Sequence, residues 1–193
     1  MADVKSMSLF YRLKNIMKQL TFFCFLIFFS SLSLAQTYST NRAQAEVSGE
    51  TSVASYTGVS DKLEGKMNLE TNKVDFKIPI KSIDTDNNTR NRHMFEAMEV
   101  SKFPNAEFHG KIISPFDPNK KVSQTVKVKG DLTIHGKTRA FETNVQLTPK
   151  GEGIEFSSEW KINITDFGIE RPSVLFMKVD DQHTISIKGI LTK

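Results

Sequence analysis

Apolar and polar residues alternate along most of the chain with a period of two. In residues 74–80, valine, phenylalanine and isoleucine occupy every second position, with aspartate, lysine and proline between them. Because successive side chains of a strand point to opposite faces of a sheet, this pattern predicts antiparallel strands with one apolar and one solvated face. A pair of strands is also expected around residues 45–58. The same alternation recurs at residues 63–69, 106–112, 126–134, 141–147, 154–164 and 185–191.

About eight such strands that close on themselves form a barrel. The predicted fold class is all-β, an extended antiparallel barrel of the lipocalin type, wide enough to hold one small ligand. Pro79 lies within a predicted strand, which indicates an edge, a bulge or a position at the barrel mouth.

The predicted inward face repeatedly carries a residue with little or no side chain. Mid-strand glycine costs stability and marks a bulge, a barrel corner or the close approach of another group. Two interpretations stay open: sharp bends that allow closure, or a lumen left empty for a ligand. The positions are Gly65, Gly110, Gly130, Ser158 and Gly189.

One helical insert, at residues 87–99, interrupts the strands. Thr89 is a candidate N-cap and Pro104 ends the segment. Basic residues stand at the start of the helix and apolar residues follow, so the insert is predicted to form a lid with a cationic edge. Residues 163–176 form a second irregular stretch, expected to line the other rim.

The candidate binding residues fall into three groups. Arginine binds phosphate or carboxylate bidentately, and methionine adapts to chains of variable shape. The head-group candidates are Arg90, Arg92 and His93, and the lid candidates are Met94, Phe95, Met98 and Phe103. The candidates for the lumen wall are Phe76, Ile78, Leu132, Ile134, Phe156, Trp160, Ile162 and Ile187.

Residues 1–35 have the pattern of a cleaved signal peptide. Lys14 and Lys18 precede the apolar run TFFCFLIFFSSLSLA, and Ser33 and Ala35 fit the small-residue rule for cleavage. Met17 is an alternative start, and an uncleaved anchor is the main alternative to cleavage. Export to the periplasm or beyond is therefore expected, with no stable membrane insertion after cleavage.

Removal of this segment changes the charge and cysteine arguments. It holds four of the 26 Lys and Arg and one of the 22 acidic residues, which leaves a net charge of +1 for residues 36–193. A near-neutral domain gives no electrostatic reason to expect nucleic-acid binding. The single cysteine, Cys24, lies in the segment, so the remaining domain has no thiol for catalysis, metal binding or disulfides.

Catalytic and metal-binding patterns are weak. His93, His109, His135 and His183 have no metal-ligand spacing, and no GxSxG elbow or glycine-rich phosphate loop is present. We therefore predict neither an enzyme nor a cofactor nor a metal site.

Three ordered motifs resemble those of the YceI-like family. They are SIDTDNNTRNRHMFEAMEVSKFPNAEFHGKI, GDLTIHGKTR and ITDFGI, and the similarity extends from about Thr37 to Lys193. The chain departs from the family at Asn91, where aspartate is usual. The resemblance implies a lipocalin-like barrel in residues 36–193, exported from the cytoplasm, that binds isoprenoid-type or other long-chain amphiphilic lipids in its lumen without catalysis.

Three function classes follow. The first is binding or transport of a long-chain lipid, isoprenoid or fatty-acid type, in the cell envelope. The second is a stress-related interaction module of the envelope with a filled core, and the third is an enzyme acting on lipids. The sequence does not indicate the oligomeric state.

Overall fold

The computed structural model describes residues 36–52, 54–171, 173–174 and 177–193. The predicted signal peptide, residues 1–35, lies outside the described residues.

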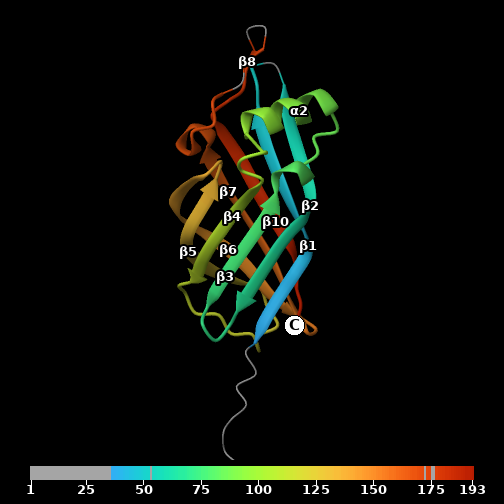
Figure 1. The fold of residues 1–193 in the computed structure, drawn as a ribbon. Helices are drawn as coiled ribbons and strands as arrows, with labels where there is room; N and C mark the ends of the chain where they lie inside the picture. Colours follow the sequence, from blue (N-terminus) through green and yellow to red (C-terminus); the bar gives the residue numbers. More distant parts are fainter. Residues whose placement is uncertain (1–35, 53, 172, 175–176) are drawn as a thin grey trace, which may run out of the picture. The chain divides into compact units, whose positions relative to one another are not determined.

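Eight antiparallel strands form a closed barrel in the order β1-β10-β7-β6-β5-β4-β3-β2 (Figure 1). This confirms the predicted fold class. The strands are β1 (Thr37–Glu50), β2 (Ser55–Asn68), β3 (Lys73–Pro79), β4 (Asn105–Ile112), β5 (Gln124–Ile134), β6 (Lys137–Lys150), β7 (Gly153–Asn163) and β10 (Gln182–Leu191).

The period-two pattern becomes the inside and outside of the barrel. On β2, Leu63 and Met67 are buried, whereas Glu64 and Lys66 between them are exposed. Burial of the apolar face stabilises the barrel by about 25 cal/mol per Å² removed from water. Tight turns connect β5 to β6 and β6 to β7. At the β5–β6 turn, His135 and Gly136 have φ angles of 52° and 69°, as a two-residue hairpin turn requires.

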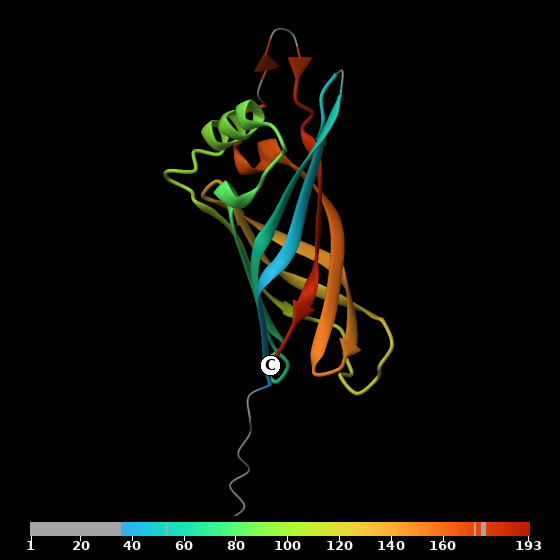
Figure 2. The same ribbon diagram turned by 90° about the vertical axis from the view of Figure 1, so that its right-hand side faces the viewer.

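The helical segments gather at one end of the barrel (Figure 2). The helix α2 (Asn88–Ala97) begins after Asn87, whose side chain accepts a hydrogen bond from the backbone N–H of Arg90. The predicted N-cap, Thr89, is therefore wrong, because the Asn87 side chain caps the helix two residues earlier. The short helices are η1 (Ile80–Ser82) and η2 (Ile164–Phe167), and β8 (Ser173–Val174) pairs with β9 (Met177–Lys178).

Two neighbouring strand pairs separate towards this end of the barrel. β6 pairs with β7 from Gln146 to Lys150, and β2 pairs with β3 from Glu64 to Asn68. Beyond these pairs, η2 lies beside β6 and β7, and Asp84 pairs with Val59 of β2. The stretch after β7 thus lines the same end of the barrel as α2, and the expectation that it lines the other rim is wrong.

The opposite end of the barrel is closed by tightly packed side chains. Met67, Ile154, Leu191 and Val126 have at most 1% of their surface exposed. They belong to one apolar cluster that also contains Tyr38. A solid plug at one end and an opening at the other define the direction of the lumen.

The inward glycines make room for aromatic rings. Gly65 pairs with Phe76 across β2 and β3, and a Cβ on Gly65 would collide with that ring. Gly110 accommodates Phe108 in the same way, whereas a Cβ on Gly130 would meet the backbone of β4. These glycines therefore do not leave the lumen empty. They allow the rings and backbones of neighbouring strands to pack closely.

Candidate functional site

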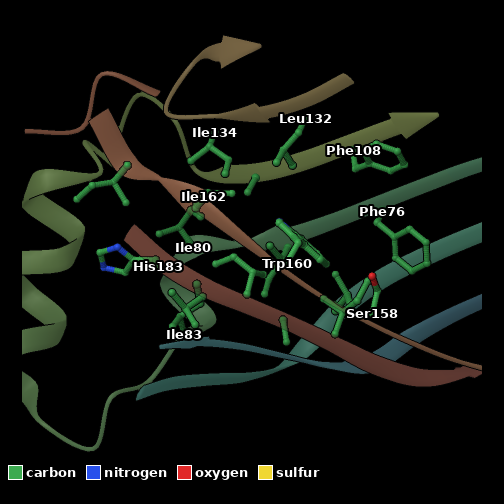
Figure 3. Close-up of a pocket in the computed structure, with 18 of the residues that line it drawn as sticks. Phe76, Ile80, Ile83, Phe108, Leu132, Ile134, Ser158, Trp160, Ile162 and His183 are labelled. Atoms are coloured by element: carbon green, nitrogen blue, oxygen red, sulfur yellow. The ribbon is translucent and has the colours of Figure 1, made fainter. Parts of the chain in front are cut away.

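The barrel encloses an elongated cavity of about 660 Å³ (Figure 3). This volume lies within the range of about 300–1,000 Å³ that is typical of small-molecule sites. The wall is apolar along most of its length, from Leu147 and Leu191 near the plug to Met94 of α2. The shape and lining suit a long apolar chain.

All eight residues predicted for the lumen wall line this cavity. They are Phe76, Ile78, Leu132, Ile134, Phe156, Trp160, Ile162 and Ile187. Figure 3 shows Trp160 at mid-depth, with Phe76 towards one end and His183 towards the helix. Their contact with a ligand stays a prediction.

Aromatic rings form much of the wall. The ring centroids of Phe76 and Phe156 are 5.2 Å apart, as are those of Phe141 and Trp160. Phe108 lies edge-on to Phe141 at 5.9 Å. Tilted and edge-on pairs of this kind hold each other in place, so the wall is a preformed surface.

The four predicted lid residues have different places. Met94 and Met98 line the cavity beneath α2. Phe95 packs against the cluster of Ile80 and Ile83 and faces a separate surface depression. Phe103 packs edge-on against the ring of His135 at 5.0 Å, away from the cavity. Periodicity alone could not separate these positions, because all four are apolar residues of the same short segment.

The three predicted head-group residues also separate. Arg90 and His93 line the cavity, whereas Arg92 lines the separate depression beside α2. The Arg90 guanidinium lies 5.5 Å from the centroid of the Tyr56 ring and donates a hydrogen bond to the backbone oxygen of Thr85. Of the two predicted arginines, Arg90 therefore stands at the mouth of the cavity.

Asn91 ties α2 to the segment that precedes it. Its side-chain oxygen accepts hydrogen bonds from the backbone N–H and the hydroxyl of Thr85, and its amide nitrogen donates to Asp84 at 2.8 Å. The hydrogen bond from Asn91 holds the pKa of the Asp84 carboxyl below its ordinary value. Asparagine supplies both an acceptor and a donor here, which an ionised aspartate does not. This network fixes Arg90 over the mouth.

A tyrosine–histidine pair that the sequence pattern did not predict lies at the mouth. The Tyr56 hydroxyl lies 2.6 Å from Nε2 of His183, and both residues line the cavity. Burial raises the pKa of Tyr56 and lowers the pKa of His183. Both side chains are therefore neutral at neutral pH.

The sequence contained a signal for one member of this pair. His183 lies in step with Ile185 and Ile187 of the same strand, so the alternation places it inward. Tyr56 lies out of step with Leu63, because consecutive exposed residues, Asp61 and Lys62, reverse the alternation within β2. A bulge of this kind cannot be read from an alternating pattern.

Other classes of site are not seen in the described part of the chain. Among those residues, no three His, Cys, Asp or Glu side chains lie close enough together to hold a metal ion. The same residues contain no helix with the length and apolar character needed to cross a membrane.

The family comparison matches the YceI-like domain to residues 37–190. The chain belongs to the YceI-like family. Among curated relatives, a UPF0312 protein of Pseudomonas syringae pv. syringae (strain B728a) is 27% identical over 134 residues. The alignment covers 64% of this chain and 65% of that protein, so the chain spans slightly less than two thirds of its relative's length.

Two solved structures share the fold of this chain. A polyisoprenoid binding domain from Saccharophagus degradans, implicated in plant cell wall breakdown, superposes with a TM-score of 0.68 at 14% identity. The match covers 82% of this chain and 98% of that domain. BcnA from Burkholderia cenocepacia superposes with a TM-score of 0.64 at 17% identity, covering 78% of this chain and 96% of BcnA.

Proposed function

We propose that this YceI-like protein binds a long-chain amphiphilic lipid, of isoprenoid or fatty-acid type, inside the barrel. The chain of the lipid lies along the apolar wall, and its polar head lies at the mouth beside α2. The observation that carries the proposal is the 660 Å³ apolar cavity. A barrel with a filled core, the alternative, would not contain it.

The distribution of polar groups sets the orientation of the lipid. Most polar residues that line the cavity lie at the α2 end. A polar head finds hydrogen-bond partners there, whereas an apolar tail would leave the same polar side chains without partners. They are Thr51, Ser55, Tyr56, Thr85, Asn87, Thr89, Arg90, His93 and His183. The description of the Saccharophagus degradans domain as polyisoprenoid binding supports an isoprenoid chain.

The proposal includes a place and a mode of action. The signal-peptide pattern of residues 1–35 supports export to the periplasm or beyond, where the protein carries its lipid between membranes or to an enzyme. The described residues that line the cavity are mostly apolar and include no pair of carboxylates and no activated nucleophile, which supports binding without catalysis.

Mass spectrometry of the lipid extracted from the purified protein tests the proposal. We expect a stoichiometric long-chain lipid, which rebinds to the protein after its removal with organic solvent. Ala45 lines the cavity and is 5% exposed, so the Ala45→Phe substitution should fill the lumen and reduce rebinding about tenfold or more. Overpacking costs about 1–3 kcal/mol of stability, which a domain of this size tolerates.

The matched control is Gln44→Phe, one residue earlier in β1, where the side chain lies outside the cavity lining. It adds the same ring and should leave rebinding unchanged. An equal loss of lipid in both variants, or rebinding by neither the parent nor the control, would contradict a binding site in the lumen.

A further inference from the structure

The Tyr56–His183 pair is built from three strands. Tyr56 comes from β2 and His183 from β10, and Gly49 of β1 lies beneath both. A Cβ on Gly49 would stand 2.6 Å from Nε2 of His183 and from the Tyr56 oxygen. The φ angle of Gly49 is one that any residue can adopt. The backbone therefore does not require glycine here, and the missing side chain makes room for Tyr56 and His183.

The hydrogen bonds of His183 determine where its proton lies. Nδ1 is 3.3 Å from the backbone oxygen of Asp181, which can only accept, so Nδ1 carries the hydrogen. In the neutral ring Nε2 is then an acceptor, and the Tyr56 hydroxyl must donate to it. Burial keeps His183 neutral, because only 6% of its surface is exposed.

This arrangement uses the only proton of the Tyr56 hydroxyl. The phenolic oxygen retains lone pairs and no donor, so a group at the cavity mouth can approach it only as a hydrogen-bond donor. Arg90, whose guanidinium lies over the Tyr56 ring, can only donate. A head group that satisfies both side chains must accept from Arg90 and donate to Tyr56.

We propose that Tyr56, positioned by His183, and Arg90 form a subsite that selects lipids with an O–H group at the head. An alcohol meets this requirement, and so does a singly protonated phosphate monoester. An aldehyde, ketone or ether accepts from Arg90 and leaves the Tyr56 oxygen without a donor. The inference rests on the proposed lipid binding and adds the chemistry of the head.

Geranylgeraniol and geranylgeranial test the proposal, because they differ in whether the terminal oxygen carries a hydrogen. Dissociation constants are measured by native mass spectrometry, which also reveals a covalent adduct of the aldehyde by its mass. We expect the alcohol to bind about tenfold more tightly than the aldehyde, since a buried polar group left unpaired weakens binding. Geranylgeranyl monophosphate is the third ligand. Its affinity, compared with that of geranylgeraniol, shows whether the subsite prefers the O–H group of a phosphate or of an alcohol.

Tyr56→Phe removes the acceptor and keeps the ring. We expect it to bring the alcohol and the aldehyde to within about twofold of each other. The control, Tyr38→Phe, deletes a phenolic hydroxyl in the apolar cluster at the closed end and should retain the preference of the parent. Arg90→Gln should weaken binding of the monophosphate more than binding of the alcohol, because only the monophosphate is itself charged and forms an ion pair with Arg90.

Equal affinity of the parent protein for the alcohol and the aldehyde would overturn this inference and leave the proposed lipid binding intact. An unchanged preference in Tyr56→Phe would also overturn it. Failure of all three lipids to bind would overturn both the inference and the isoprenoid form of the proposed function.

Discussion

Phe76 and Gly65 are directly paired across two strands, and the ring occupies the space where any other residue at 65 would place its Cβ. Phe156 and Gly189 are paired as well, but a Cβ on Gly189 would first meet the Cβ of Ala43, at 2.6 Å, and the Phe156 ring at 3.1 Å. Aromatic rings lying over glycines stiffen strands that glycine alone would weaken. At the residue scale, the packing of the wall thus depends on pairs in which an aromatic ring lies over a glycine.

Gly65→Ala should therefore lower the free energy of unfolding. The added methyl group displaces the Phe76 ring, and overpacking of this kind costs about 1–3 kcal/mol. Urea denaturation measures the change. In a Phe76→Leu background the ring is gone, so the same substitution should cost much less, and an equal cost in both backgrounds would disprove the ring contact.

The buried His183 should make the protein less stable in acid. Burial lowers its pKa in the folded state, whereas the unfolded chain has the ordinary value of about 6.5. The unfolded state therefore takes up a proton first, and the free energy of unfolding falls as the pH drops through about 6.5. Denaturation between neutral and mildly acidic pH should show this fall in the parent and a smaller one in His183→Gln.

His109 provides an opposite reference for that measurement. A hydrogen bond to Asp75 raises its pKa, so its contribution is present below about 6.5 and is lost as the pH rises through the folded-state pKa. Because the ring is 62% exposed, solvent screening keeps the effect small. His109→Gln should leave the loss of stability in acid unchanged. If the parent and His183→Gln show identical pH profiles, His183 is not the cause of that loss.

At the scale of the elements, the outer face of the sheet carries a row of like charges. Lys111 of β4 pairs directly with Lys73 of β3 on one side and with Lys129 of β5 on the other. All three are exposed. Like charges directly opposite on neighbouring strands destabilise a sheet. The outward lysines therefore weaken the pairing of β4 with β3 and with β5 at Lys111.

Lys111→Glu should raise the free energy of unfolding by about 0.2–1 kcal/mol, because it replaces two repulsions by two attractions. Lys111→Gln removes the repulsion alone and should give a smaller gain. Salt screens exposed charges, so urea denaturation at low and high ionic strength should show the gain shrinking. A gain that does not depend on salt would point to strand propensity as its cause.

The elements also show how much of the fold the sequence predicts. Segments such as 126–134 alternate without interruption, and each became a strand with the expected inward face. The bulge of β2 at Asp61 and Lys62 reverses the pattern, so the inward position of Tyr56 was hidden. The sequence predicted Phe103 on the lid because it is an apolar residue close to the other lid candidates. Its contact with His135 depends on a turn 32 residues later, which no local pattern shows.

At the scale of the whole domain, closure of the barrel turns separate strand patterns into one site. The plug around Met67 and Leu191 closes one end, and the separation of β6 from β7 and of β2 from β3 opens the other. The mouth collects Arg90, Tyr56 and His183 from segments far apart in sequence. No local pattern specifies such a meeting of residues, which is why the lumen wall and Arg90 could be predicted from the sequence and the Tyr56–His183 pair could not.

The single tryptophan of the chain, Trp160, offers the most direct test of the central claim, because it lines the cavity at mid-depth. Bromine quenches indole fluorescence only at close range, so the measurement is the fluorescence of the lipid-free protein titrated with a long-chain lipid brominated in the middle of its chain. We predict saturable quenching at one lipid per protein, strongly reduced in Ala45→Phe and retained in Gln44→Phe. Stoichiometric binding of the brominated lipid without quenching of Trp160 would place the lipid outside the barrel and contradict the account.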